Sequence, residues 1–260
     1  MGSAMNESKA SGHSTCPLCH GPTSQKFARR GSGQLTADSF SSRKTVENHH
    51  PDYRECALCQ VLVAVEQIDP LQLNELYRSA TFTSADESRF AARTYSRVLE
   101  REIKNASSIL DIGSSDGAFL TQCRKLGVNA LLGIEPSAAA AAVATENTWV
   151  GPFAQYSGEG EWDLITLFMT IEHLQDPEDF LQWAKKRLAP GGLLAVAHHD
   201  YRAPVNLVLG ARSPILDIEH LRIYSKTSMK KTFEDSRIRS HKTGDVRKCL
   251  SVGLLWPPHV

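Results

Sequence analysis

The sequence lacks a long apolar run, a net charge and a targeting segment. None of its hydrophobic stretches reaches the roughly 18 residues that a membrane-spanning helix requires, so we expect no membrane partner. The 29 Lys and Arg residues balance the 29 Asp and Glu residues, and nothing in this balance favours binding to a nucleic acid. The first residues contain neither the basic nor the apolar stretch of a leader peptide. We therefore expect a cytoplasmic protein.

The chain is long enough for one large domain with a small attachment. It has 260 residues, of which 41% are hydrophobic and 22% charged, which is ordinary for a globular protein. Composition and patterning divide it into a disordered tail (1–15), a small cysteine-bearing module (16–66), linking helices (67–104) and a larger domain (105–260). Inside the module, a Ser-, Arg- and Gly-rich stretch over 24–50 predicts a long loop.

Two helices are predicted in the linking region. The first begins after Asp69, which suits an N-cap, with Pro70 at the first helical position. The second covers 84–104, where Ser84 and Glu87 have the spacing of a capping box.

From residue 107 onward, strand and helix patterns alternate. Apolar strand patterns cover 107–112, 129–135, 162–168 and 192–199, and helix patterns cover 117–126, 137–144 and 177–188. Strands separated by helices predict an α/β fold, a Rossmann-like doubly wound parallel sheet with helices on both faces. Ligands of such sheets bind beyond the carboxyl ends of the strands.

The first of these strands ends in a glycine turn, DIGSSDG. Gly113 and Gly117 let the backbone approach a ligand closely, and the next strand ends in Glu135, whose carboxylate can accept both hydroxyls of a ribose. A pyrophosphate would need a middle glycine, but Ser115 stands there, and Asp116 puts a negative charge at the helix N-terminus. This pattern favours an adenosine with an ammonium group and no phosphate, such as S-adenosylmethionine. A glycine turn of this kind also occurs in sheets that bind nothing.

Four of the six cysteines form two C-x-x-C pairs. Two thiolates from each turn complete a tetrahedron around zinc, and four sulfurs leave no open position, so the metal would be structural. The 36 residues between the pairs exceed the spacing of the compact pattern, and unrelated thiols remain the alternative. The predicted zinc ligands are Cys16, Cys19, Cys56 and Cys59.

Four motifs occur in the order DIGSSDG, GIEPS, EWDLITLFMTIEHLQDP and LAPGGLLAV. Together they resemble the class I S-adenosylmethionine-dependent methyltransferases over about residues 70 to 235. The resemblance implies that the 105–260 domain binds S-adenosylmethionine and that four groups of residues contact it. These are Asp111, Gly113, Ser115 and Gly117 at the methionine part, Glu135 and Pro136 at the ribose, Phe153 and Ala154 beside the adenine, and Phe168 and Met169 near the sulfonium.

The cysteine pairs together with these motifs resemble a narrower group, methyltransferases with an N-terminal zinc-binding module. This group includes sugar C-methyltransferases, whose large C-terminal domain is missing from this sequence. The resemblance implies a small-molecule acceptor such as a sugar, a glycan intermediate or a secondary metabolite, within a biosynthetic pathway. Whether an oxygen, carbon or nitrogen atom is methylated stays open, as does the oligomeric state.

Transfer from a sulfonium is an in-line displacement that often requires removal of a proton from the acceptor. In DIEHLRIYS, Glu219 and His220 match the acid and histidine of the sugar C-methyltransferases, which implies that His220 is the base and that Glu219 orients it, with Tyr224 as a further hydroxyl. The alternative is that this segment only leads into a helix capped by Ser225. His173 is a further candidate for a catalytic residue, although the favoured interpretation is that it belongs to a turn that closes over the site.

Three other interpretations stay open. His198 and His199 are a second candidate for the base. Together with Glu172 and His173 they allow a divalent-metal site like that of small-RNA 2′-O-methyltransferases, although Met169 stands where that motif has a further glutamate. The second function class is a methyltransferase that acts on rRNA or another RNA, and the basic residues of the 24–50 stretch favour it. A catalytically degenerate, zinc-bearing interaction module is the third. The apolar tail over 244–260 predicts either a last strand or a partner surface.

Overall fold

The computed structural model describes residues 15–31, 35–41, 50–66, 68–82 and 85–238. Most of the predicted tail, the capping residue Ser84 and the apolar C-terminal stretch lie outside the described residues. Among the described helices, none combines the length and the apolar character that a membrane crossing needs.

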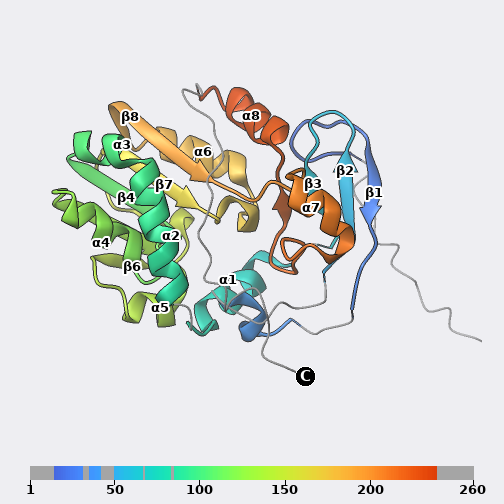
Figure 1. Ribbon diagram of the computed structural model, residues 1–260, viewed down its shortest axis with the longest axis horizontal. Coiled ribbons are helices and arrows are strands. Elements are labelled where there is room, and N and C mark those ends of the chain that lie inside the picture. The colour runs from blue at the N-terminus through green and yellow to red at the C-terminus, as the bar shows by residue number, and fades with distance from the viewer. Residues whose placement is uncertain (1–14, 32–34, 42–49, 67, 83–84, 239–260) are drawn as a thin grey trace, which may run out of the picture.

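A five-stranded parallel sheet forms the centre of the larger part (Figure 1). The predicted parallel α/β architecture is confirmed, and the sequence patterns missed only the short edge strand β6. In sheet order, the strands are β6 (Thr148–Val150), β5 (Ala130–Glu135), β4 (Ser108–Ile112), β7 (Trp162–Phe168) and β8 (Leu188–Ala197).

Helices cover both faces of this sheet because successive side chains of a strand point to opposite sides. Ile109 of β4 packs in one buried cluster with α2 (Ala85–Val98), α3 (Glu100–Asn105) and α4 (Ala118–Lys125). Leu110 faces the other cluster, which contains α6 (Pro177–Lys185). The single long helix predicted over 84–104 was wrong, because the chain breaks at Leu99 between α2 and α3.

Helix boundaries follow the predicted caps closely. Asp69 accepts hydrogen bonds from the amides of Leu71 and Gln72 at the start of α1 (Pro70–Ser79). Ser137 caps α5 (Ala138–Ala142), and Ser225 caps α8 (Lys226–Asp235) through a capping box with Ser228. Two further helices, α7 (Pro204–Leu209) and the short η4 (Gly210–Arg212), follow the last strand of the parallel sheet.

A second, antiparallel sheet contains the N-terminal segment. Its order is β1 (Thr23–Phe27), β2 (Tyr53–Cys56), β3 (Leu62–Ala64) and β9 (Arg222–Ile223). The prediction of one long loop over 24–50 was therefore partly wrong, because its first residues pair with β2 and a short helix, η1 (Ala37–Phe40), follows. β9 comes from a distant part of the sequence. The predicted domain boundary at residue 105 stays a prediction, but the strand pairing crosses it.

The two sheets share a hydrophobic core. Cys16, Cys56 and Cys59 are buried in the same cluster as Leu110 of β4 and Phe180 of α6. A smaller cluster joins Tyr53 and Leu62 of the N-terminal sheet to Tyr201, Ile215 and Leu216, which lie between β8 and β9. The cysteine-bearing segment is thus built onto the larger part and not merely tethered to it.

The glycine turn after β4 has a packing requirement that a substitution can test. Gly113 has φ +72°, and a Cβ there would clash with Thr170 Oγ1. Gly127 also has positive φ, but no atom would lie within 4 Å of its Cβ. We expect Gly113→Ala to lower the free energy of unfolding by about 1 to 2 kcal/mol more than Gly127→Ala, measured by chemical denaturation.

Adding Thr170→Ala to Gly113→Ala should recover part of that loss, because the crowded side chain is then removed. Equal losses in Gly113→Ala and Gly127→Ala would show that crowding at Thr170 is not a constraint.

Candidate functional site

The glycine turn is fixed to the neighbouring strand through its backbone. The amides of Gly113 and Ser114 both donate to the carbonyl oxygen of Ile134, at 2.8 and 3.2 Å. Gly113, Ser115 and Gly117 all have positive φ, at 72°, 52° and 72°. The chain therefore doubles back tightly at the carboxyl end of β4, where ligands of parallel sheets bind.

Glu135, the last residue of β5, links the turn to the next helix. One carboxylate oxygen accepts the amide of Ser115 at 2.8 Å, and the other accepts the amide of Ser137 at 2.8 Å. Burial raises the carboxyl pKa to about 7, although both backbone hydrogen bonds oppose this shift. Each oxygen has a second lone pair, so the carboxylate can still accept two hydroxyls.

Asp111 is buried near the carboxyl end of β4, the central strand of the sheet, one strand away from Glu135. Its side chain accepts a hydrogen bond from Thr166 Oγ1 at 2.6 Å. Burial raises its pKa to about 7, and the charge of Glu135 adds to the shift, while the Thr166 hydroxyl opposes it. Two acidic groups at one end of a sheet, with no Lys or Arg among the hydrogen-bond partners that the described residues supply, suit a positively charged ligand.

Aromatic side chains hold the other predicted cofactor residues. Phe168 stacks on Tyr95 of α2 with the ring centroids 4.1 Å apart, and its ring meets Phe119 of α4 edge-on. Phe153, in the short helix η2 (Phe153–Gln155) that also contains Ala154, meets Phe180 and Trp183 of α6 edge-on. Met169 has φ +50° at the end of β7, so the backbone turns away from the sheet there.

A cluster of histidines lies beyond β7 and β8. His173, in the short helix η3 (Ile171–His173), lies with its ring centroid 4.8 Å from that of His220. The ring of His199 lies 5.3 Å from that of His220. One ligand atom from each of His173, Glu219 and His220 falls within 4.8 Å of the others, a spacing at which the three groups could hold a metal ion.

His220 has a defined tautomer. Its side chain is buried, and Nδ1 lies 2.7 Å from the carbonyl oxygen of Ile215, which only accepts hydrogen bonds. Nδ1 therefore carries the hydrogen, and Nε2 has a lone pair. Burial lowers the imidazole pKa, and nearby His173 lowers it further, while the carboxylates of Glu219 and Asp217 oppose both effects. A neutral imidazole with a fixed tautomer suits proton abstraction.

His173 and Glu172 have different environments. His173 Nδ1 lies 2.7 Å from the hydroxyl of Tyr77 in α1 and 3.8 Å from a carboxylate oxygen of Glu219. Glu172 is fully buried, and its carboxylate accepts the amide of His199 at 2.6 Å. The Glu172 side chain thus fixes the backbone just after β8, and the interpretation of residues 172 and 173 as a turn that closes the site stays a prediction.

The part of the chain that contains these site residues also matches a known protein family. A family model described as a methyltransferase domain matches residues 83–236, more than half of the 260 residues. The chain belongs to this family. It is a class I S-adenosylmethionine-dependent methyltransferase, and the resemblance seen in its motifs is confirmed.

Several solved structures are similar in outline. A possible histamine N-methyltransferase from Thermotoga maritima is 20% identical with a TM-score of 0.48, covering 58% of this chain and 72% of its own. The plantazolicin methyltransferase BpumL, solved with SAH, is 19% identical at 0.40, covering 65% and 64%. A sugar N-methyltransferase from Streptoalloteichus is 21% identical at 0.36, covering 41% and 47%.

The methyltransferase thus spans less than two thirds of the length of the last two proteins, and their activities are not transferred to it. No curated protein is similar enough to be counted as a relative.

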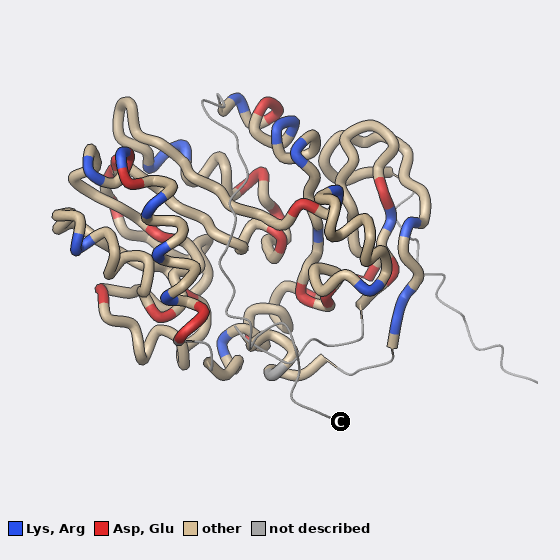
Figure 2. The backbone as a smooth tube through the Cα atoms, viewed as in Figure 1, with Lys and Arg blue, Asp and Glu red and all other residues tan. Residues whose placement is uncertain are grey.

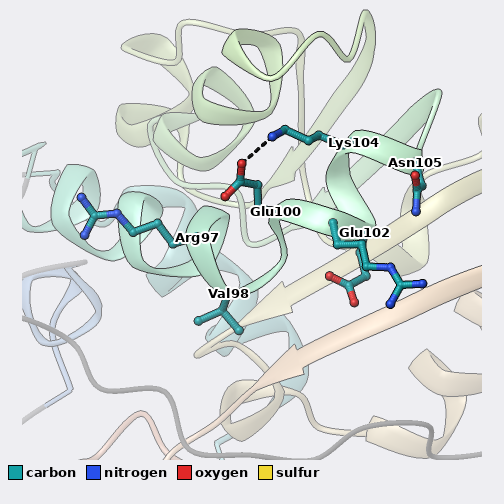
Figure 3. A pocket seen from close by; sticks show the side chains of 7 residues that line it. Arg97, Val98, Glu100, Glu102, Lys104 and Asn105 are labelled. Atoms are coloured by element: carbon teal, nitrogen blue, oxygen red, sulfur yellow. Dashed lines mark hydrogen bonds and ion pairs between the residues drawn. The ribbon is translucent and has the colours of Figure 1, made fainter.

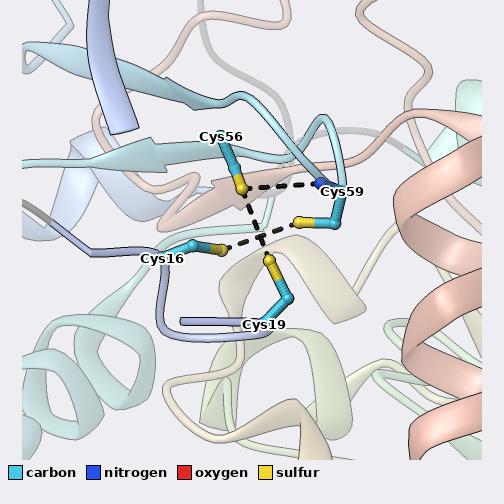
Figure 4. A group of neighbouring side chains, drawn as sticks. All are labelled: Cys16, Cys19, Cys56 and Cys59. Atoms are coloured by element: carbon cyan, nitrogen blue, oxygen red, sulfur yellow. Dashed lines mark hydrogen bonds between the residues drawn. The ribbon is translucent and has the colours of Figure 1, made fainter. Parts of the chain in front are cut away.

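The four predicted zinc ligands of the methyltransferase lie together (Figure 4). The Sγ atoms of Cys16 and Cys59 are 3.6 Å apart, and those of Cys19 and Cys56 are 3.4 Å apart. Thiolates around a tetrahedral zinc, with Zn–S bonds of about 2.3 Å, lie about 3.8 Å from one another. The four residues therefore fit zinc, with only small movements.

The two C-x-x-C turns repeat one backbone pattern. The amide of Cys16 donates to Gly21 and that of Cys56 to Val61, while the carbonyls of Cys16 and Cys56 accept the amides of His20 and Gln60. His20 and Gln60 both have positive φ, at 56° and 61°. The amides of the residues two positions after Cys16 and Cys56 point to the Sγ atoms of these cysteines at 3.4 Å. Such amides stabilise thiolates, as a metal site requires.

Two other surface features do not mark the site. Figure 2 shows Lys and Arg interspersed with Asp and Glu along the described chain, without a stripe of one sign. A hollow beside α3, drawn in Figure 3 with the Lys104–Glu100 ion pair, lies where α3 leads into β4. This is the amino end of the strands, opposite the end where parallel sheets bind ligands.

The structure brings the predicted acidic, glycine and histidine residues to one end of the sheet. Tyr224 is fully buried in the core that contains Cys16, with its ring centroid 5.8 Å from that of His198, and its role as a further hydroxyl stays a prediction. Sequence reasoning missed Tyr77, Thr166 and Thr170, which contact the site from other elements. No local pattern marks these three, because each contact joins residues more than 50 positions apart in sequence or depends on the turn geometry.

The raised pKa of Asp111 predicts how stability depends on pH. Because its folded pKa of about 7 exceeds the value of 3.8 for a solvated aspartate, its contribution to stability is largest below about pH 4 and is lost as the pH rises to 7. Asp111→Asn does not titrate, and its amide oxygen can still accept from Thr166. We expect the variant to gain about 3 kcal/mol of unfolding free energy relative to wild type between pH 4 and pH 8.

Denaturant titrations at both pH values measure this gain, with the exposed Asp86→Asn as the control. A difference between Asp111→Asn and wild type that does not change with pH would show that this carboxyl titrates normally.

Proposed function

We propose that the protein transfers the methyl group of S-adenosylmethionine to a small-molecule acceptor such as a sugar, a glycan intermediate or a secondary metabolite. The observation that carries this proposal is the buried His220, whose Nδ1–H is fixed by a backbone carbonyl while Nε2 stays basic. His173 and His199 lie with their ring centroids 4.8 and 5.3 Å from that of His220, and Glu219 lies beside them, so several groups that can accept or hold a proton surround the proposed base.

In this proposal the cofactor occupies the carboxyl ends of β4 and β5. The ribose hydroxyls donate to Glu135, and the ammonium group lies near the glycine turn and Asp111, where a positive charge offsets two buried carboxylates. Phe153 and Ala154 lie beside the adenine, Pro136 beside the ribose, and Phe168 and Met169 near the sulfonium. Ser115 contributes through its backbone, which Glu135 holds.

His220 takes the acceptor's proton as the acceptor atom attacks the methyl carbon, and Glu219 stabilises the resulting imidazolium. The electron pair of the breaking C–S bond stays on sulfur, so the products are S-adenosylhomocysteine and the methylated acceptor. His173 shares the charge through Glu219, from which its Nδ1 is separated by 3.8 Å.

Zinc bound by Cys16, Cys19, Cys56 and Cys59 has a structural role in this proposal. Three of these cysteines are buried, and all four sulfurs are used, so no coordination position remains for a substrate. The metal would close two distant turns into one unit. The purified protein should then contain one zinc ion per chain.

Glu135 makes cofactor binding depend on pH. Below its pKa of about 7 the carboxyl is protonated and loses its charge, so the affinity for S-adenosylhomocysteine should fall about tenfold per pH unit between pH 7 and pH 5.5. Glu135→Gln should bind at least about thirtyfold more weakly at pH 8, with a shallower pH profile than wild type because only Asp111 still titrates near the ligand. Isothermal titration calorimetry measures both.

Zinc content is the control for that experiment, and Glu135→Gln and Glu135→Ala should both keep one zinc per chain. Wild-type affinity in Glu135→Gln at pH 8 would exclude Glu135 as the ribose ligand.

His220 can be separated from cofactor binding. His220→Asn should bind S-adenosylhomocysteine within about threefold of wild type, while methyl transfer falls by a factor of about 100 or more. The measurement is transfer of labelled methyl from S-adenosylmethionine to a panel of sugars, amines and phenols. His173→Asn and His199→Asn are the matched controls, and loss of transfer in one of them with full activity in His220→Asn would move the base to that residue.

The same panel distinguishes the other function classes. The basic residues Arg29 and Arg30 near the N-terminal sheet favour an RNA methyltransferase as the alternative. Such an enzyme would transfer the labelled methyl group to ribosomal RNA and not to the small acceptors. A degenerate interaction module would release no heat with the cofactor.

A further inference from the structure

The loop that carries Glu219 and His220 is attached to the N-terminal sheet. The residues that follow it form β9, and β9 pairs with β3 through Leu62↔Ile223 and Val63↔Arg222. The amide of Ala64 in β3 also donates to the carbonyl of Leu221 at 3.0 Å. The candidate base therefore stands directly before a strand of the sheet that carries the cysteine turns.

Tyr53 holds the same loop from inside. It is the first residue of β2, its side chain is 0% exposed, and its hydroxyl lies 2.7 Å from the carbonyl oxygens of both Asp217 and His220. These two carbonyls span the turn that presents Glu219. A hydroxyl has one hydrogen, so the Tyr53 O–H is shared between the two carbonyl oxygens and holds both close to one point.

Tyr53 is itself rigidly placed. Its backbone pairs with Phe27 of β1 on one side and with Ala64 of β3 on the other. β2 ends three residues later at Cys56, which lies in the cysteine cluster. The position of the Tyr53 hydroxyl thus depends on strands that the two cysteine turns fasten together.

We propose that Tyr53 is a positioning residue for His220, and that the N-terminal cysteine-bearing sheet serves to set the geometry of the acceptor side. The proposal rests on the assignment of His220 as the base. Tyr53 fixes the carbonyl of His220, and the carbonyl of Ile215 fixes the ring through Nδ1. With both ends held, Nε2 points in one direction.

The proposal separates the two halves of the site. The cofactor side depends on the turn after β4 and on Glu135, which Tyr53 does not contact. Loss of the Tyr53 hydroxyl should therefore leave cofactor affinity unchanged while it loosens His220. A purely structural role for Tyr53 would lower overall stability without changing the tautomer of one histidine.

Tyr53→Phe tests this, with Tyr201→Phe as the matched control. Tyr201 is also buried against the N-terminal sheet, but its hydroxyl donates to Glu55 at 2.7 Å and not to the 217–220 loop. The readout is ¹⁵N NMR of the histidine side chains in the cofactor-free protein. In Tyr53→Phe we expect the His220 Nδ1–H form to give way to the mixed tautomers of a solvated imidazole, whereas Tyr201→Phe keeps the wild-type signal.

Two further measurements complete the test. The amide of Leu221, which donates to Glu172, should exchange its hydrogen about tenfold faster in Tyr53→Phe. The affinity for S-adenosylhomocysteine should stay within about twofold of wild type, since the cofactor side is untouched. An unchanged His220 tautomer with unchanged exchange at Leu221 would overturn the proposal.

If Tyr53→Phe does not fold, hydrogen exchange of the wild type decides. The amides of residues 217–223 should open together with those of β2 and β3 as denaturant is added, and independent opening of 217–223 at lower denaturant would overturn the proposal. These readouts do not involve the reaction. If His220→Asn keeps full methyl transfer, the proposed base is wrong, while the tautomer still reports whether Tyr53 positions the ring.

Discussion

Two hydrogen bonds to Glu172 hold the segments of the candidate site together. Its carboxylate accepts the amide of His199 at the end of β8, and its backbone carbonyl accepts the amide of Leu221 just before β9. The residue is completely buried, and a buried carboxylate is costly unless its hydrogen bonds are made. One side chain thereby fixes the end of the parallel sheet, and the backbone beside it fixes the segment that returns to the antiparallel sheet. His173 is the next residue in the chain, so the same two hydrogen bonds fix its backbone position.

The other buried acids carry a different meaning. Asp111 and Glu135 both have pKa values raised to about 7 by burial, and neither has a cationic partner among its hydrogen bonds. Two such groups at one end of a sheet weaken the empty protein, and a cationic ligand offsets that cost. Raised carboxyl pKa values at the carboxyl end of a parallel sheet mark a candidate binding site. Their position agrees with the S-adenosylmethionine dependence of the family.

The grouping of the predicted cofactor residues at one end of the sheet could be read from the sequence because these residues are close together in the chain. Asp111, Gly113, Gly117 and Glu135 all fall within one strand–helix–strand unit, and their spacing expresses its geometry directly. Helix caps were predictable for the same reason, as at Asp69 and Ser225. The short strands of the N-terminal sheet were not, because β1 and β9 have only five and two residues and their pairing partners lie elsewhere in the chain. The break at Leu99 also left no local signal.

The acceptor side differs because it is assembled from three distant segments. Tyr77 comes from α1, His173 from the turn after β7, and His220 from the loop before β9. The motif resemblance marked His173 and His220 separately, and the hydrogen bond from the Leu221 amide to the Glu172 carbonyl joins their two segments in the fold. A site built in this way can change its acceptor by altering a loop while the cofactor turn stays the same. The S-adenosylmethionine dependence follows from motifs within one stretch of sequence, whereas the proposed acceptor side requires segments that only the fold brings together.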